Sequence, residues 1–330
     1  MLIGWRGHIA NGCRRPGRFA GLRAGKTSGL TPNEETDNAF GSGEPFSLGV
    51  EEELFLVDPV TGHQANASAA VQERLGPVDG TVESELHACL LVLITDVCRN
   101  AGEAVGTLGG LRRAVVATGA GLLGSATHPS SVEGDARIHD LLGDAVATPV
   151  GATHIHIGMP DAETAITTFN GLRRHLPLLQ ALAANSPFRH GRDTGLASAR
   201  EVTLRGWPRS GVPRAMRDFE DFLTTTQVLV RAADVPDYTW FWWKLRPHPR
   251  LGTVEIRALD AQASLEDTAA LVALARPHAD ELGCADQLDL LPALLERGGG
   301  AARQRGLYEI AGMDALLREL TRITGAVTGE

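Results

Sequence analysis

The chain has 330 residues, of which 43% are apolar, so it is long enough for one large globular domain or two ordinary ones. Its net charge of -9 argues against binding to nucleic acid through bulk electrostatics. No run reaches the ~18 apolar residues that a membrane helix needs. The four cysteines include no pair with the spacing of a zinc or redox motif, which favours a protein of the reducing cytoplasm.

The first 30 residues contain six basic residues and no acidic one, and they lack the apolar core of a signal peptide. Their composition has too few large apolar residues to offset the entropy lost on ordering. We interpret residues 1–44 as a disordered leader, or as the product of a start codon assigned too far upstream. A single folded domain is expected over residues 45–330.

Hydrophobic patterning predicts strands and helices that alternate without a regular strand–helix–strand rhythm. Residues 86–97 are almost continuously apolar, and their periodicity leaves a buried strand and a buried helix open. Pro177 is expected to begin a second helix rather than lie inside the first. The pattern favours an α+β fold with an antiparallel sheet. Strands are expected at 46–57, 121–125, 150–158, 240–246 and 252–259, and helices at 101–118, 161–182, 215–232, 265–282 and 313–323.

Three consecutive glutamates lie within the first predicted strand, between Val50 and Leu54. A charge run usually marks a solvated surface. Here the apolar residues on both sides indicate a core strand, in which Glu51 and Glu53 share one face because alternate side chains point the same way. Inward carboxylates need a counter-ion. Hard oxygen ligands favour Mg²⁺ or Mn²⁺, so the sequence predicts a divalent metal site on this face.

Other segments carry further donors of the same kind. Glu85 is one, His154 and His156 share a face of a second predicted strand, and Glu255 shares a face of a third with Arg257. The two imidazoles leave two roles open, because either can contact a metal or hydrogen-bond a substrate or phosphate.

Two segments carry the candidate arginines. Residues 191–200 combine flexible backbone with Arg192, and the segment around the third strand includes Arg246 and Arg250. Arginine binds carboxylates and phosphates with two hydrogen bonds, although structural pairing with nearby acids is the alternative. The sequence has no P-loop and no dinucleotide-binding glycine motif before a helix. Any ATP is therefore expected to bind through metals and arginines.

Together these segments resemble the glutamate–cysteine ligase family, in its second bacterial branch of carboxylate–amine ligases. The resemblance extends over about residues 46–282, and its motifs occur in the family's order. The segments that carry it are Gly49–Val57, Thr95–Cys98, Thr127–Pro129, Thr153–Gly158, Leu179–Phe188, Gly191–Ser198 and Arg246–Arg257.

The resemblance implies a funnel-shaped antiparallel sheet with helices on its outer face, related to the glutamine synthetase fold. It implies an ATP-dependent ligase, in which a carboxylate is phosphorylated and an amine then displaces phosphate to form an amide. ATP and Mg²⁺ or Mn²⁺ would be the cofactors. Small-molecule acids and amines would be the partners, with no nucleic acid and no membrane, and a homodimer is allowed.

The resemblance also assigns roles to the candidate residues. The metal ligands would be Glu51, Glu53, Glu85, His154 and Glu255. Arg257 would steady the transferred phosphoryl group, with Arg192 and Arg246 as further catalytic candidates. Contacts to the nucleotide would come from Arg192, Arg250 and His156.

One segment departs from the family pattern. The family has a glutamine and a glutamate where this chain has Leu90 and Val92, so a carboxylate expected at the metals is missing. Loss of one ligand reduces metal affinity or repositions an ion. Two alternatives to the ligase follow: a catalytically weakened relative that binds a small acid or a protein, and a phosphotransferase on the same fold.

Overall fold

The sheet that organises the molecule is antiparallel throughout and has the strand order β2-β3-β1-β5-β9-β8, with β4 pairing beside β1. The computed structural model describes residues 38–130 and 148–275. The strands of the sheet are β1 Leu48–Val57, β2 Thr81–Ser84, β3 Leu90–Ile94, β4 Gly121–Leu123, β5 Ala152–Gly158, β8 Leu245–His248 and β9 Thr253–Leu259.

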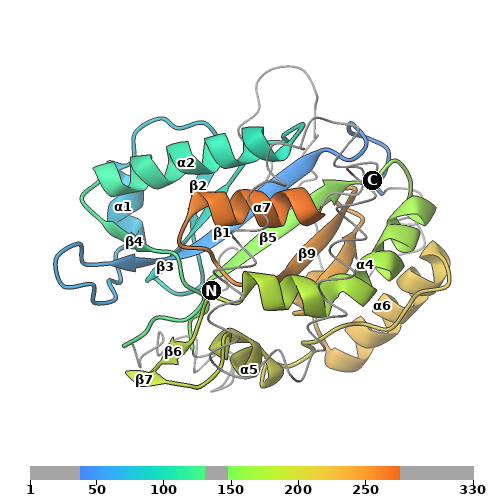
Figure 1. The fold of residues 1–330 in the computed structure, drawn as a ribbon. Coiled ribbons are helices and arrows are strands. Elements are labelled where there is room, and N and C mark those ends of the chain that lie inside the picture. Colours follow the sequence, from blue (N-terminus) through green and yellow to red (C-terminus); the bar gives the residue numbers. More distant parts are fainter. Residues whose placement is uncertain (1–37, 131–147, 276–330) are drawn as a thin grey trace, which may run out of the picture.

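Helices lie against one face of this sheet, where α2, α7 and α4 cross in front of its central strands (Figure 1). A two-stranded hairpin, β6–β7, lies below them in this view. The predicted α+β fold, with an antiparallel sheet and helices on its outer face, is confirmed. The remaining elements are α1 Ser68–Arg74, α2 Ala101–Ala117, α4 Ala162–Ala183, β6 Phe188–Arg189, β7 Arg192–Asp193, α5 Ala199–Arg205, α6 Phe219–Ala233 and α7 Leu265–Ala275.

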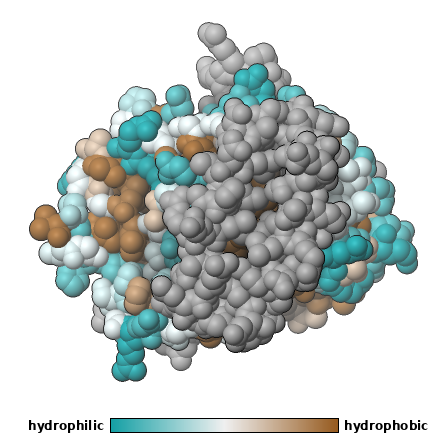
Figure 2. Space-filling view, viewed as in Figure 1, coloured by the Kyte–Doolittle hydropathy of each residue, from teal (hydrophilic) through white to brown (hydrophobic). Residues whose placement is uncertain are grey.

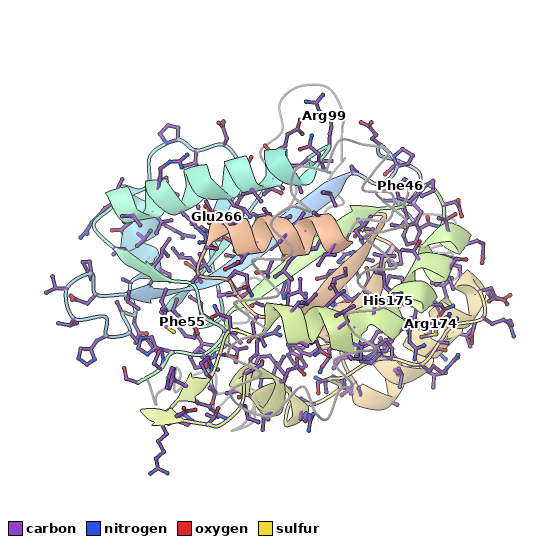
Figure 3. The ribbon with its side chains drawn as sticks, viewed as in Figure 1. Phe46, Phe55, Arg99, Arg174, His175 and Glu266 are labelled. Carbon is purple, nitrogen blue, oxygen red and sulfur yellow. The ribbon has the colours of Figure 1, made fainter. Side chains whose placement is uncertain are left out.

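Strand β1 separates two environments because its side chains alternate. Val50, Leu54 and Leu56 are fully buried in the main apolar core, between the sheet and the helices. Phe55, labelled in Figure 3, points to the opposite face and packs with Cys89 and Leu90 in a small second cluster. Most of the core thus lies on the helical face, which leaves much of the other face to polar side chains.

The helices begin where short polar side chains can cap them. The Asn100 side chain accepts a hydrogen bond from the Glu103 amide at the start of α2, and Asp161 accepts one from the Thr164 amide, at 2.7 Å, at the start of α4. Pro177 lies inside α4, so the prediction that it begins a second helix was wrong. Buried leucines on both sides of the proline hold this part of the helix against the core, which outweighs the missing N–H.

Two other expectations changed in the structure. Residues 86–97, left open between strand and helix, contain strand β3. The strand predicted at 240–246 is present but lies later in the sequence, because a 3₁₀ turn at Tyr238–Trp240 comes first and β8 spans Leu245–His248. The helix predicted at 313–323 lies outside the described residues, as does the end of the one predicted at 265–282.

Among the described residues that Figure 2 colours, hydrophobic ones gather at the left of the view. Val60 and Val116 are among the large apolar side chains exposed in the described part of the chain. None of the described helices combines the length and hydrophobicity needed to span a bilayer.

A buried ion pair connects β1 to the helical layer. The Glu52 carboxylate is fully buried and accepts hydrogen bonds from Arg112 of α2, from Nε at 2.8 Å and from Nη2 at 2.7 Å. Thr268 of α7 donates a third, at 2.8 Å. Arg112 also donates to the carbonyls of Gln262 and Ala263, so one guanidinium ties the strand to two other segments.

Replacing Arg112 by alanine should therefore destabilise the fold. The buried Glu52 carboxylate would keep only the Thr268 hydroxyl, and an unpaired buried charge costs about 3–5 kcal/mol. Arg113→Ala is the matched control, because its side chain is exposed and should change stability by less than about 0.5 kcal/mol. Urea unfolding followed by circular dichroism measures both. Equal unfolding free energies for the two variants would contradict the role given to the pair.

Residues just before the expected domain boundary also pack on the fold. The Ala39 amide donates to the Pro249 carbonyl at 2.8 Å, and the Gly41 amide donates to the Met159 carbonyl at 2.9 Å. The Phe40 ring meets Phe219 edge-to-face, with 5.6 Å between centroids. The packed domain thus includes residues before the boundary expected at 45.

A chain that begins at Asn38 should accordingly be more stable than one that begins at Pro45. The shorter chain loses the Phe40 contact and two backbone hydrogen bonds, which together are worth about 1–3 kcal/mol. A drop of several degrees in the thermal midpoint of the shorter chain alone is the expected result. Identical midpoints would show that these contacts add nothing to stability.

Candidate active site

The predicted polar side chains meet on the sheet face that points away from the helices. Residues directly opposite each other in an antiparallel pair share a face. Glu51 of β1 pairs with His154 of β5, and His156 of β5 pairs with Glu255 of β9. Arg246 of β8 is in turn opposite Glu255. The register of four strands therefore assembles residues that are up to two hundred positions apart in sequence.

Two histidines hold the Glu51 carboxylate. His154 Nδ1 lies 3.3 Å from Glu51 Oε2, and His156 Nε2 lies 3.5 Å from Glu51 Oε1. Burial alone would raise the pKa of Glu51, but the hydrogen bond with His154 and the close approach of His156 hold it well below its usual range. Burial and then the charge of Arg257 lower the pKa of His154 to about 4, so this imidazole is neutral at pH 7.

The pKa of His156 is shifted in the opposite direction from that of His154. Burial acts to lower its pKa, but the carboxylates of Glu255 and Glu51 reverse the effect, so its pKa is raised. Its Nδ1 lies 3.0 Å from the Thr253 hydroxyl, and its Nε2 lies 3.7 Å from Glu255 Oε1. The His156 ring thus lies between two carboxylates and favours its protonated form.

The negative charge of Glu53 is only partly compensated by neighbouring positive groups. Burial, followed by the negative charge of Glu85, raises its pKa to about 8, and Arg257 and Arg200 only partly oppose the shift. Its one ion-pair contact among the described residues is His154 Nε2, at 3.7 Å. Glu85, which directly follows β2, is therefore close enough to repel Glu53. A pair of carboxylates in this state attracts a cation.

The charge of Glu255, unlike that of Glu53, is fully compensated by arginines. Its Oε2 accepts a hydrogen bond from Arg246 Nε at 2.6 Å, and its Oε1 accepts one from Arg257. Burial would raise its pKa, but Arg246 and Arg257 hold it well below the usual range. Arg246 also donates to the Thr239 carbonyl at 3.2 Å. Both oxygens of Glu255 thus anchor guanidinium groups.

Two predicted arginines lie apart from this group. Arg192 is exposed in the β6–β7 hairpin, where it pairs with Arg189. Arg250 lies in the turn between β8 and β9, has 49% of its side chain exposed, and donates to Asp237 Oδ2 at 3.0 Å. Their predicted contacts to substrate or nucleotide therefore rest on the resemblance and not on this geometry.

Sequence reasoning did not single out Arg200, which is only 3% exposed. Its Nη2 donates to the Arg257 carbonyl at 2.9 Å, and its Nη1 lies 3.8 Å from Asp260 Oδ1. Within residues 38–130 and 148–275 its Nε and Nη1 have no hydrogen-bond partner, although Nη1 also lies 3.9 Å from Glu201 Oε1 and the guanidinium acts electrostatically on Glu53. The signal available was its place in the first turn of a short helix, two residues after the capping Ser198.

Asp260, at the end of β9, fixes the segment that carries Arg200. Its Oδ2 accepts from the Ser186 hydroxyl at 2.7 Å and from the Asn185 amide at 2.9 Å. Its Oδ1 accepts from the Ser198 hydroxyl at 3.0 Å. One carboxylate therefore ties residues 185–200 to the strand that bears Arg257.

Val92 lies on the same face as the site. It is opposite Glu53 on one side and Glu83 on the other, and it belongs to neither apolar cluster although only 8% of it is exposed. The apolar side chain thus occupies a place among carboxylates. In the described parts of the chain, no three histidine, cysteine, aspartate or glutamate side chains are arranged to hold a metal ion.

Known proteins resemble this chain in sequence and in fold. The sequence model of glutamate-cysteine ligase family 2 matches residues 47–316. Two proteins of Rubrobacter xylanophilus are similar: "Putative glutamate--cysteine ligase 2-1", 32% identical over 81% of this chain and 91% of its own length, and "Putative glutamate--cysteine ligase 2-3", 36% identical over 84% and 81%.

Among solved structures, a bifunctional glutathione synthetase from Pasteurella multocida superposes with a TM-score of 0.52. The match covers 85% of this chain but only 47% of that one, and with 15% identity it shows likeness of fold alone. The sequence matches go further, because the family model covers most of the chain and the relatives exceed 30% identity. The chain therefore belongs to glutamate-cysteine ligase family 2, as its motifs predicted.

Proposed function

We propose that this protein is an ATP-dependent carboxylate–amine ligase that works through an acyl phosphate. The observation that carries the proposal is the division of charge on the sheet face. Glu53, whose pKa is raised by burial and by the charge of Glu85, marks an acidic end, while Arg257 and the buried Arg200 place guanidinium groups beside it. The acidic end suits a divalent cation, and the basic end suits the phosphate or carboxylate of a substrate.

The donor set at the acidic end fits Mg²⁺ or Mn²⁺ because it consists of hard carboxylate oxygens. Glu53 and Glu85 are the first candidates, since they repel each other without a cation. Glu51, His154 and Glu255 stay in the proposed set, but in this structure each is already paired within the chain. A bound divalent cation would neutralise phosphate charge as it is transferred.

The arginines would have different roles in binding and catalysis. Arg257 would contact the transferred phosphoryl group, and Arg200 would offer an anionic oxygen its Nε, which makes no hydrogen bond within the described part of the chain. Arg246 would act indirectly, since it holds Glu255, which in turn holds Arg257. Arg192, Arg250 and His156 remain the proposed contacts to the nucleotide.

The chemistry then has two steps. An oxygen of the substrate carboxylate attacks the γ-phosphorus of ATP, and ADP leaves. The nitrogen of a neutral amine attacks the acyl carbon, the C–O bond to phosphate breaks, and the amine gives up a proton. Arg257 and Arg200 stay beside the phosphoryl oxygens in both steps, where negative charge develops.

One observation favours a second candidate, a weakened relative that binds a small acid without turnover. Val92 takes a place on the site face where the family resemblance has a carboxylate. A site with one donor fewer binds metal less well and catalyses more slowly.

The ligase proposal predicts that ADP and phosphate form only when an acid and an amine are both present with Mg²⁺-ATP. A panel of amino acids and amines, scored by mass spectrometry for a product equal to the two substrates minus water, measures this. Arg257→Gln should reduce turnover by at least about 100-fold, because it removes a charged contact made to the reacting group. Arg174→Gln, an exposed change on α4, should leave turnover unaltered (Figure 3).

The same assays distinguish the ligase from the phosphotransferase and from the weakened relative. A stable phosphorylated acid or amine would replace the ligase with a phosphotransferase. Thermal stabilisation by an acid without any ADP would favour the weakened relative.

Val92→Glu should tighten binding of Mn²⁺ and raise any ligase activity. The new carboxylate would point from β3 toward Glu53 and supply the donor that the family places there. Leu93→Glu is the matched control, since Leu93 lies on the helical face in the main core and its replacement should only destabilise the protein. Isothermal titration with Mn²⁺ measures affinity. Loss of stability in Val92→Glu that is equal with and without metal would contradict the prediction.

A further inference from the structure

The backbone ladder between β8 and β9 is incomplete at the row that carries Arg257. The register of these strands places Lys244 directly opposite Arg257, one position beyond the pair of Leu245 and Ile256. The Arg257 amide donates to the Lys244 carbonyl at 2.8 Å, as the antiparallel pattern requires. The Lys244 amide donates elsewhere, to the Gly211 carbonyl at 2.9 Å. The row is therefore held by one backbone hydrogen bond where a regular pair has two.

Two consecutive residues of α5 compensate for the missing backbone bond. The Arg257 carbonyl, which a regular ladder would pair with the Lys244 amide, accepts a hydrogen bond from Arg200 Nη2 at 2.9 Å. The next residue, Glu201, contacts the Lys244 ammonium through its Oε2. One short helix thus contacts both strands at the same row, β9 through Arg200 and β8 through Glu201.

The ion pair between Glu201 and Lys244 is sheltered from water. Only 14% of the Lys244 side chain and 17% of the Glu201 side chain are exposed, against 77% and 34% in the surface pair of Arg99 and Glu103. Salt screens a partly buried pair much less than an exposed one, and the lower local dielectric strengthens its attraction. The contact between α5 and β8 is therefore stronger than that of an ordinary surface pair.

The start of α5 holds the Glu201 backbone in place. Ser198 is the N-cap residue, and its hydroxyl accepts a hydrogen bond from the Glu201 amide at 3.3 Å. The same hydroxyl donates to Asp260 Oδ1 at 3.0 Å, which fixes the first turn to the end of β9. In a capping box, a glutamate at this position bonds back to the amide of the N-cap residue. Here the Glu201 carboxylate reaches Lys244 instead, so its role is tertiary and not local.

We infer that Glu201 is a positioning residue, which holds the row of Arg257 in place through Lys244. The inference rests on the proposed function, because the Arg257 guanidinium is the group assigned there to the transferred phosphoryl group. Like charges directly opposite each other on neighbouring strands repel. Lys244 and Arg257 are such a pair, and the carboxylates of Glu201 and Glu255 offset the repulsion from either side. Without Glu201, this end of the ladder would open and Arg257 would lose its fixed place.

Hydrogen–deuterium exchange resolved to single amides tests this placement without any substrate. In Glu201→Gln, the Arg257 amide should exchange at least about tenfold faster than in wild type, because local opening sets the exchange rate. The Leu48 amide, bonded to the Cys98 carbonyl at 2.7 Å at the start of β1, should exchange as in wild type. Equal acceleration of both amides would mean general destabilisation and would contradict the inference.

Kinetic measurements test the consequence, with the substrates that the product assay identifies. Glu201→Gln and Lys244→Met should each lower kcat by about tenfold and leave KM within about twofold, because a misplaced Arg257 acts in the transition state. Lys244→Arg keeps the ion pair and should stay within about threefold of wild type. The double variant should be no slower than either single one, because both remove the same interaction. Glu103→Gln, which breaks the surface pair with Arg99, is the matched control and should leave kcat unaltered.

The two measurements separate this inference from the proposed function. Unchanged exchange of the Arg257 amide in Glu201→Gln would overturn the inference, whatever reaction the chain catalyses. Faster exchange at Arg257 with unaltered turnover would overturn it as well, because the placement would then not matter to the reaction. If wild type forms no ligation product, the ligase proposal fails, and the exchange of the Arg257 amide still decides whether Glu201 holds that row.

Discussion

Three consecutive carboxylates on one core strand are the constraint around which this molecule is built. Water is largely excluded on both faces of β1, so each of the three needs compensation from the protein or from a ligand. Glu52 turns to the helical layer and is fully matched by Arg112 and Thr268. Glu51 and Glu53 turn to the other face, where the compensation is uneven. The same strand therefore stabilises the fold with one glutamate and contributes the other two to the proposed binding site.

The three carboxylates on the site face differ in how far neighbouring groups compensate their negative charge. Glu255 is matched by two guanidinium groups and Glu51 by two imidazoles, while Glu53 faces a second carboxylate. The acidic end around Glu53 and the basic end around Arg257 are thus held close together on a rigid sheet. A metal–phosphate pair has the complementary arrangement of charge, which is why we prefer a phosphoryl-transfer ligase to a module that binds a lone acid.

Strand periodicity was enough to predict which face most site residues share. The period of two placed Glu51 with Glu53 and His154 with His156, and the register then brought Glu255 and Arg246 to them. Nothing in a period of two says which neighbour satisfies which charge. The pairing of Glu52 with Arg112 depends on how a helix sixty residues away crosses the strand, so it could not be predicted.

Local rules failed where tertiary packing overrode them. Pro177 was expected to begin a helix, but the leucines around it belong to the core and keep α4 continuous. Arg192 was chosen in the glycine-rich segment, although the buried arginine is Arg200. Both carry the same charge within ten residues of each other, and only tertiary contacts distinguish them: Ser198 and Arg200 are bonded to Asp260 and to the Arg257 carbonyl, while Arg192 is exposed in the hairpin.

That anchoring has a consequence for how the protein meets an anion. Asp260 is held by the hydroxyls of Ser186 and Ser198 and by the Asn185 amide, so Arg200 and Arg257 sit on a common rigid frame before any ligand arrives. Side chains ordered in advance lose little entropy on binding and need little rearrangement as charge shifts in the reaction. In the proposed site, selectivity would then follow from spacing: an anion whose oxygens span the two guanidinium groups would contact both, and a shorter one would reach only one of them.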